Sequence, residues 1–80
     1  MTSTFPAVTA KQVVKVIEKL GFVFVRQSGS SHAIYKRGSD HRRTVIPIHA
    51  KVILKKKTLK SILKDADLTL EQFRTILLES

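Results

Sequence analysis

The stretch that sets the fold reads FVFVRQSGSSHAIYKRGSDHRRTVIPI at residues 22–48. It contains three short runs of β-branched and aromatic residues, which are typical of strands, at 22–26, 32–37 and 43–48. Glycine and small polar residues between the runs predict two tight turns, at 28–31 and 38–40. Because such short connections join neighbouring antiparallel strands, we expect a three-stranded meander. Pro47 lacks a backbone donor, which predicts that the third strand lies at an edge of the sheet.

An amphipathic helix is predicted before this meander, over residues 8–20. Thr9 and Gln12 have the spacing of a capping box, and Gly21 is a typical residue just beyond a helix end. Helical periodicity predicts that the buried side of this helix is formed by Val13, Val14, Ile17 and Leu20.

Two further helices are predicted after the meander. Residues 50–57 fit no single pattern, and we expect Thr58 to cap the next helix, whose apolar side holds Leu59, Ile62, Leu63 and Ala66. Asp67 and Leu68 interrupt that pattern. Thr69 and Gln72 form a second capping box, and the final helix carries an apolar side made of Leu70, Phe73, Ile76 and Leu77.

The predicted order of elements is α-β-β-β-α with a short extra helix, which is an α+β fold. Eighty residues suffice for one domain, residues 1–80, with residues 1–7 as a loose N-terminal arm. Two amphipathic helices can cover one face of a three-stranded antiparallel sheet, and the other face stays open. This order matches the double-stranded-RNA-binding fold.

The composition is strongly basic, with 15 Lys and Arg against 6 Asp and Glu, a net charge of +9 and a pI near 10.4. Such an imbalance favours a polyanionic partner, which is nucleic acid first and an acidic protein second. The absence of cysteine excludes disulfides and thiolate metal sites. No apolar run approaches a membrane span, and we find no signal-peptide pattern, so we expect no membrane contact and a cytoplasmic location.

His32 is the candidate catalytic residue. It opens an apolar strand-like run directly after the small residues Gly29, Ser30 and Ser31. Glycine lets backbone N–H groups approach an anion, and serine adds a hydroxyl donor. Histidine side chains titrate near neutral pH, so His32 could take a proton from a ribose 2′-hydroxyl or donate one to a leaving oxygen.

The other titratable residues are weaker candidates. His49 ends the third predicted strand and either assists His32 or lies in solvent, whereas His41 is expected to be exposed in a turn. The three histidines match no familiar ligand spacing, and the acidic residues show no paired-carboxylate pattern for two-metal chemistry. We therefore predict no metal site and no cofactor.

Two basic clusters predict contacts with a phosphate backbone. One flanks the second turn and contains Lys36, Arg37, Arg42 and Arg43. The other precedes the penultimate helix and contains Lys55, Lys56 and Lys57, where a helix N-terminus would add its dipole. Tyr35 is the one aromatic residue predicted to stack on a base.

The chain resembles the HicA family of mRNA interferase toxins from toxin–antitoxin pairs. The resemblance rests on the order of five segments, which read Leu-Gly-Phe at 20–22, Arg-Gln at 26–27, Ile-Tyr at 34–35, TVIPIH at 44–49 and TLKSILK at 58–64. It implies a double-stranded-RNA-binding-like fold, mRNA cleavage, a catalytic histidine at His32 and inhibition by a HicB-type antitoxin. Because no metal-ligand pattern is visible, we expect the cleavage to need no metal ion, and the positive charge of the chain favours an acidic antitoxin. The family pattern Gly-Ser-His-His appears here with Ser30 in place of glycine and Ala33 in place of the second histidine.

The resulting prediction is a toxin endoribonuclease. Two other functions fit the composition: a non-catalytic RNA- or DNA-binding module of the same fold, and a basic adaptor for an acidic protein. A binding module should tolerate the loss of His32, whereas a nuclease should not.

Overall fold

The computed structural model describes residues 5–29, 31–48 and 53–79. In chain order, its elements are α1 (Ala10–Lys19), β1 (Val23–Ser28), β2 (His32–Arg37), β3 (Arg42–Pro47), α2 (Lys56–Asp65) and α3 (Leu70–Leu78). The strands form one antiparallel sheet in the order β1-β2-β3, so β3 lies at an edge as Pro47 predicted.

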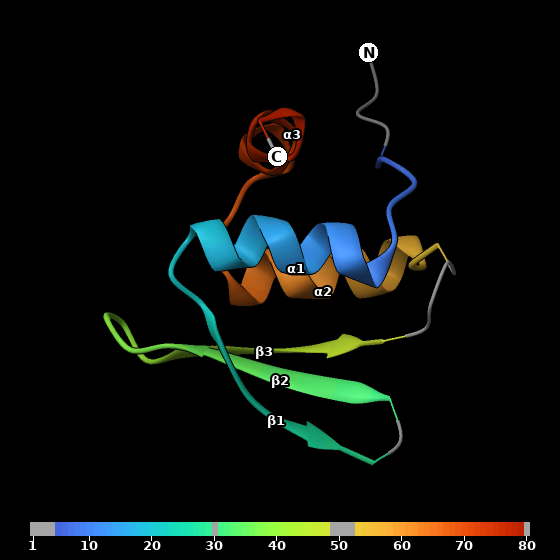
Figure 1. Ribbon diagram of the computed structural model, residues 1–80. Coiled ribbons are helices and arrows are strands. Elements are labelled where there is room, and N and C mark those ends of the chain that lie inside the picture. The colour runs from blue at the N-terminus through green and yellow to red at the C-terminus, as the bar shows by residue number, and fades with distance from the viewer. Residues whose placement is uncertain (1–4, 30, 49–52, 80) are drawn as a thin grey trace.

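The molecule has a layer of helices on one face of the sheet (Figure 1). Helices α1 and α2 cover that face, and both contact β3. The extra helix is α3, which packs on α1 on the side away from the sheet. This arrangement confirms the predicted α-β-β-β-α layout of the double-stranded-RNA-binding type.

The predicted capping signals of α1 are confirmed, although the helix spans residues 10–19 and not 8–20. The Thr9 hydroxyl accepts from the Gln12 backbone N–H, and the Gln12 side chain accepts from the Thr9 N–H at 2.9 Å. At the other end, the Phe22 and Gly21 N–H groups donate to the carbonyls of Ile17 and Glu18, which is a Schellman motif. Gly21 has φ +97°, a conformation that favours glycine.

The buried side of α1 differs from the prediction. Val13 and Ile17 are buried as expected, but Val16 is also fully buried, whereas Val14 and Leu20 are only partly buried. The reason is that α1 has two neighbours, the sheet and α3, so its buried surface is wider than one stripe.

Helix α2 starts earlier than predicted. Its first residue is Lys56 and its N-cap is Lys55, which makes no side-chain cap hydrogen bond, so the expected cap at Thr58 is wrong. Lysine is a good helix former, which allows the helix to extend upstream of Thr58. The apolar side is confirmed, and its four predicted residues are buried. In α3, Thr69 and Gln72 form the predicted capping box.

The bounds of two strands also shift. β1 begins at Val23 because Phe22 leaves the strand and is buried in the core, and it ends two residues later than predicted, at Ser28. β3 begins one residue earlier than expected, at Arg42, and ends at Pro47. β2 matches its predicted bounds.

The chain before α1 is tied to the chain before α2. The Leu54 N–H donates to the Val8 carbonyl at 2.8 Å, and Thr9 forms an isolated bridge with Ile53. The Phe5 ring packs against the core and lies under the ammonium groups of Lys56 and Lys60, 5.3 and 5.9 Å from its centroid. These contacts hold the starts of α1 and α2 at one end of the molecule.

Candidate nucleic-acid interface

His32 is the first residue of the central strand. Side chains alternate along a strand, and Ala33 and Tyr35 belong to the core beneath the helices, so His32 belongs to the opposite, open face of the sheet. It pairs with Ser28 on β1 and Pro47 on β3, and its side chain is exposed. A substrate can therefore reach the imidazole without any movement of the core.

Three cations share that open face with His32. Lys36 follows on the same side of β2, Arg26 is paired with Ile34, and Arg43 is paired with Lys36. The three cations, together with Val25 and Ile34, line a hollow of about 260 Å³. We call the group of His32, Arg26, Lys36 and Arg43 the open-face cluster. At about 3.3 Å per residue, Lys36 lies roughly 13 Å along the strand from His32, with Arg43 beside it on β3 and Arg26 beside Ile34 on β1.

The sheet divides the first predicted basic cluster in two. Lys36 and Arg43 belong to the open face, whereas Arg37 and Arg42, which pair with each other, belong to the helix side. Arg37 donates to both carboxylate oxygens of Asp40, at 3.0 and 2.8 Å, and to the Leu20 carbonyl at 3.1 Å. Its guanidinium lies 4.7 Å from the centroid of the Phe22 ring. Arg37 therefore holds the β2–β3 turn against the end of α1.

Arg42 is also engaged within the chain. Its guanidinium lies 3.2 Å from a carboxylate oxygen of Asp40 and 3.7 Å from one of Asp67. The hydrogen bond from Arg37 holds the pKa of Asp40 below its ordinary value, and the same bond raises the pKa of Arg37. These two arginines thus already have carboxylate partners and offer less charge to a phosphate than Lys36 and Arg43.

The expected stacking role of Tyr35 does not fit its position. The residue is 6% exposed and belongs to the helix side of β2. Its ring meets that of Phe24 edge to face, with centroids 5.7 Å apart. Burial, followed by the nearby charge of Glu18, raises the pKa of the Tyr35 hydroxyl. Tyr35 is a core residue, and its ring is not accessible to a base.

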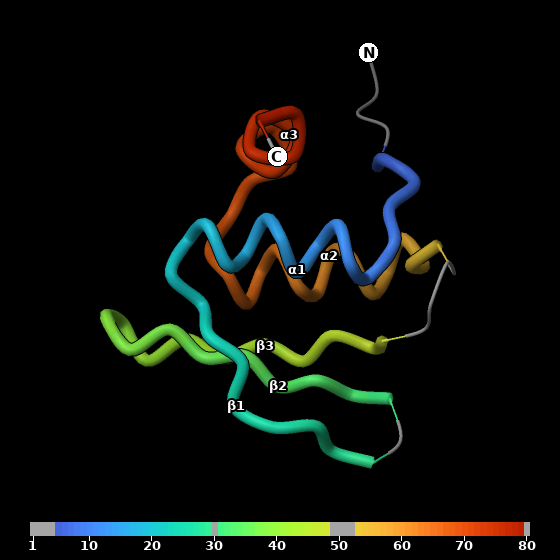
Figure 2. The backbone as a smooth tube through the Cα atoms, in the orientation of Figure 1, coloured from blue at the N-terminus to red at the C-terminus, as the bar shows by residue number. Residues whose placement is uncertain are grey.

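The second basic cluster lies at the same end of the molecule as His32. Figures 1 and 2 show that β2 begins, β3 ends and α2 begins at that end, while the β2–β3 turn lies at the other. Lys55, Lys56 and Lys57 are exposed there, and the first turn of α2 contains no acidic residue. Ser31 and Gly29, which has φ +66°, lie in the turn before His32. Two further candidates, Ser30 and His49, fall outside the described residues.

The distribution of acidic residues is a feature that the sequence reasoning missed. No Asp or Glu occurs in residues 1–17, 19–39 or 41–64, so none lies in any strand or in the first turns of α1 and α2. Asp40, Asp65 and Asp67 instead gather around Arg42 at the other end, where the Asp65 carbonyl also accepts from that arginine at 3.3 Å. The positive charge near His32 is therefore uncompensated by acids. The gaps between acids in the sequence were the signal that could have revealed this.

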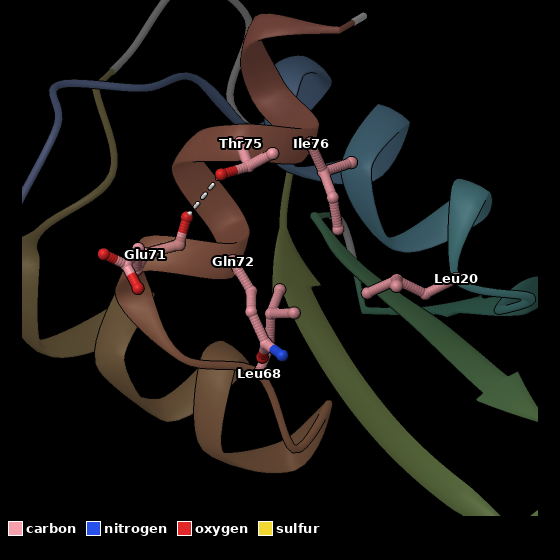
Figure 3. A pocket seen from close by; sticks show the side chains of 6 residues that line it. All are labelled: Leu20, Leu68, Glu71, Gln72, Thr75 and Ile76. Carbon is pink, nitrogen blue, oxygen red and sulfur yellow. Dashed lines mark hydrogen bonds between the residues drawn. The ribbon is translucent and has the colours of Figure 1, made fainter.

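A larger hollow, of about 340 Å³, lies away from His32. It is formed by the end of α1 and by α3 (Figure 3), and its lining consists of Leu20, Leu68, Glu71, Gln72, Thr75 and Ile76. The Thr75 hydroxyl donates to the Glu71 carbonyl of its own helix at 3.1 Å. The lining offers neither a histidine nor a cation, so this hollow lacks the chemistry of a nucleic-acid site.

Three further expectations concern His41, metal binding and membrane-spanning helices. His41 is exposed in the β2–β3 turn with φ +60°. Within residues 5–29, 31–48 and 53–79, no three His, Asp or Glu side chains are grouped so that they could hold a metal ion. No helix in this part of the chain is long and apolar enough to cross a bilayer.

The fold and the open-face cluster define a small basic protein of the double-stranded-RNA-binding-like class with an exposed histidine. A family described as the HicA toxin of bacterial toxin–antitoxin pairs matches residues 10–68, well over half of the chain. The chain belongs to this family and is therefore the toxin of such a pair, which implies an antitoxin partner. Helix α3 lies beyond the matched residues. No curated protein sequence matches the chain.

Proposed function

We propose that this toxin is an endoribonuclease that cleaves mRNA with His32 as its catalytic residue and is neutralised by an acidic HicB-type antitoxin. The observation that carries the proposal is the position of His32. It is an exposed imidazole on the open face of the sheet, a face that also carries three cations, and no acidic residue of the described strands or of the first turns of α1 and α2 lies near it. This supports binding of a polyanion with a titratable group beside its backbone.

The proposed reaction uses the ribose of the RNA as nucleophile. His32 acts as general base on the 2′-hydroxyl or as general acid on the leaving oxygen. The 2′ oxygen forms a bond to phosphorus, the bond from phosphorus to the 5′ oxygen breaks, and that 5′ oxygen takes up a proton. The products are a 2′,3′-cyclic phosphate and a 5′-hydroxyl. Nearby cations stabilise the charge that develops on the phosphoryl oxygens.

Substrate binding is assigned to cations that form no ion pair with a carboxylate of the described residues. We propose that five cations contact the phosphates of the RNA backbone: Lys36 and Arg43 on the open face, and Lys55, Lys56 and Lys57 at the start of α2. The sequence Gly29-Ser30-Ser31 directly precedes His32, so the backbone N–H groups of this segment are our candidates for contact with the scissile phosphate. Arg37 and Arg42 contribute mainly by holding the β2–β3 turn.

The chemistry can be tested with the purified full chain, an RNA oligonucleotide and its fully 2′-deoxy analogue. The RNA should be cut in EDTA and leave 2′,3′-cyclic phosphate ends, and the analogue should stay intact because it lacks the nucleophile. Mass spectrometry of the products reads both outcomes. Cleavage that requires magnesium and leaves 5′-phosphates would contradict the proposed mechanism.

A further inference from the structure

The two edges of the sheet differ in how well they are protected against pairing with another strand. Natural edge strands are usually protected by charged side chains, proline or covering segments. β3 follows this rule, since it carries Arg42, Arg43 and Pro47. β1 is less protected, because it carries a single charged residue, Arg26, and its first three residues are apolar and exposed.

The apolar group on β1 consists of Val23, Phe24 and Val25, whose exposed fractions are 62%, 53% and 45%. The outer side of β1 pairs with no strand in the described part of the chain. An edge of this kind offers unpaired backbone N–H and C=O groups together with adjacent apolar side chains, which is the surface used when a partner adds a strand to a sheet.

The chemistry of this edge also indicates what kind of strand fits. The register of β1 against β2 shifts between Phe24 and Arg26. Val25 and Arg26 both line the hollow on the open face, whereas Phe24 belongs to the helix side with Tyr35. An added strand would therefore meet an aromatic ring on one face and a cation on the other. An extended segment that alternates apolar and acidic side chains satisfies both.

The charge of the chain argues against a second copy as the occupant. Two molecules with a net charge of +9 repel each other, and their paired edges would bring cations on both sheets close together. We propose that β1 takes up an extended acidic segment of the antitoxin as a fourth antiparallel strand. This inference rests on the proposed function, because it assumes the acidic antitoxin described there.

Strand addition at β1 would also explain how the partner reaches the active site. β1 runs toward the turn before His32, and its last residue, Ser28, pairs directly with His32. Neighbouring strands lie about 4.8 Å apart, so the added strand would lie roughly 10 Å from β2. A few residues beyond its end are enough to cross Ser28 and cover the imidazole.

The test uses the full toxin and the purified protein encoded by the reading frame beside its gene. Hydrogen exchange is measured on the toxin alone and in the complex. The β1 amides that do not bond to β2 should exchange rapidly in the free toxin and become protected in the complex. The affinity of this complex should fall at least tenfold in the double variant Phe24→Thr, Val25→Thr, since threonine keeps β propensity but removes most of the apolar surface.

The matched control is Leu78→Thr, which changes an apolar residue of 86% exposure at the end of α3 and should leave the affinity unchanged.

Unprotected β1 amides in the complex, undiminished affinity of the double variant, or failure of the wild-type toxin to bind this protein would each overturn the inference. A toxin dimer that disappears in the double variant would do so as well, because the occupant would then be a second copy. Equal loss of RNA affinity in the double variant would instead identify the edge as an RNA surface. RNA cleavage by the free toxin is measured separately, so failure of the nuclease proposal is distinguished from failure of strand addition.

Discussion

The two ends of β2 show how one strand supports both function and stability. His32 starts the strand on the open face, exposed, and Arg37 ends it on the helix side with hydrogen bonds to Asp40 and Leu20. These roles were only partly predictable from the sequence. The Gly/Ser turn before His32 identified it as a candidate, but Arg37 looked like a phosphate-binding residue because a basic run does not reveal which carboxylates the fold places beside it. Tyr35 was misjudged for a similar reason, since alternation along β2 buries it.

The Arg37–Asp40 pair should make the stability of the protein depend on pH. The pKa of Asp40 is lower in the folded than in the unfolded state, so the folded protein binds fewer protons. The contribution is complete above the ordinary pKa of an aspartate and is lost as the pH falls through the lowered value. Urea unfolding between pH 7 and pH 2.5 should show a smaller loss of stability on acidification in Asp40→Asn than in the wild type. The double variant Arg37→Met, Asp40→Asn should match the single Asp40 variant in this respect, and an unchanged wild-type slope in both would contradict the assignment.

Among the helices, the ends that local sequence signals predicted best are those whose capping hydrogen bonds join residues close in sequence. The two Thr–Gln capping boxes and the end at Gly21 were readable because their hydrogen bonds lie within a few residues. The start of α2 was not, because it is set by distant contacts between its preceding segment and residues 5–9. The shift of β1 has the same origin, since Phe22 is drawn into the core.

Helix α2 ends in a second Schellman motif, in which Asp67 occupies the position usually taken by glycine, with φ +56°. Its ion pair with Arg42 is long, and its side chain is 77% exposed, so the pair stabilises little. Asp67→Gly should therefore raise the free energy of unfolding by about 0.5–1 kcal/mol, measured by urea denaturation. Asp67→Asn, which removes the charge but still tolerates this conformation, should change stability much less. A destabilised glycine variant would mean that the ion pair outweighs the backbone strain.

For the whole molecule, the separation of charge matters more than its total. Three of the six acidic residues gather around Arg42 beside the β2–β3 turn, because the turn residues and the C-terminal end of α2 meet at one end of the fold. In the described part of the chain, no ion pair lies at the other end, which holds His32. The net charge can be counted from the amino-acid composition, whereas the positions of the charges depend on the topology. An RNA strand that follows the uncompensated end would pass His32.

Loss of charge at that end should change the salt dependence of RNA binding. The variant Lys55→Gln, Lys57→Gln spares Lys56, which contacts Phe5. Each lost phosphate contact should reduce the slope of log affinity against log salt by about 0.7–1, measured by fluorescence anisotropy. The matched variant Lys19→Gln, Lys64→Gln removes two cations near the other ends of α1 and α2 and should leave the slope close to that of the wild type. Equal slopes in both variants would move the RNA surface elsewhere.

The catalytic role of His32 is tested most directly by comparing RNA cleavage by two variants, His32→Ala and His41→Ala. The second variant is the control, because it removes an exposed histidine at the other end of the same fold. Neither side chain belongs to the core, so both variants should keep the wild-type circular dichroism and RNA affinity. We expect His41→Ala to cleave like the wild type and His32→Ala to lose at least a hundredfold in rate, the scale typical of a general acid or base. A folded His32→Ala protein that cleaves RNA at the wild-type rate would show that His32 is not the catalytic residue.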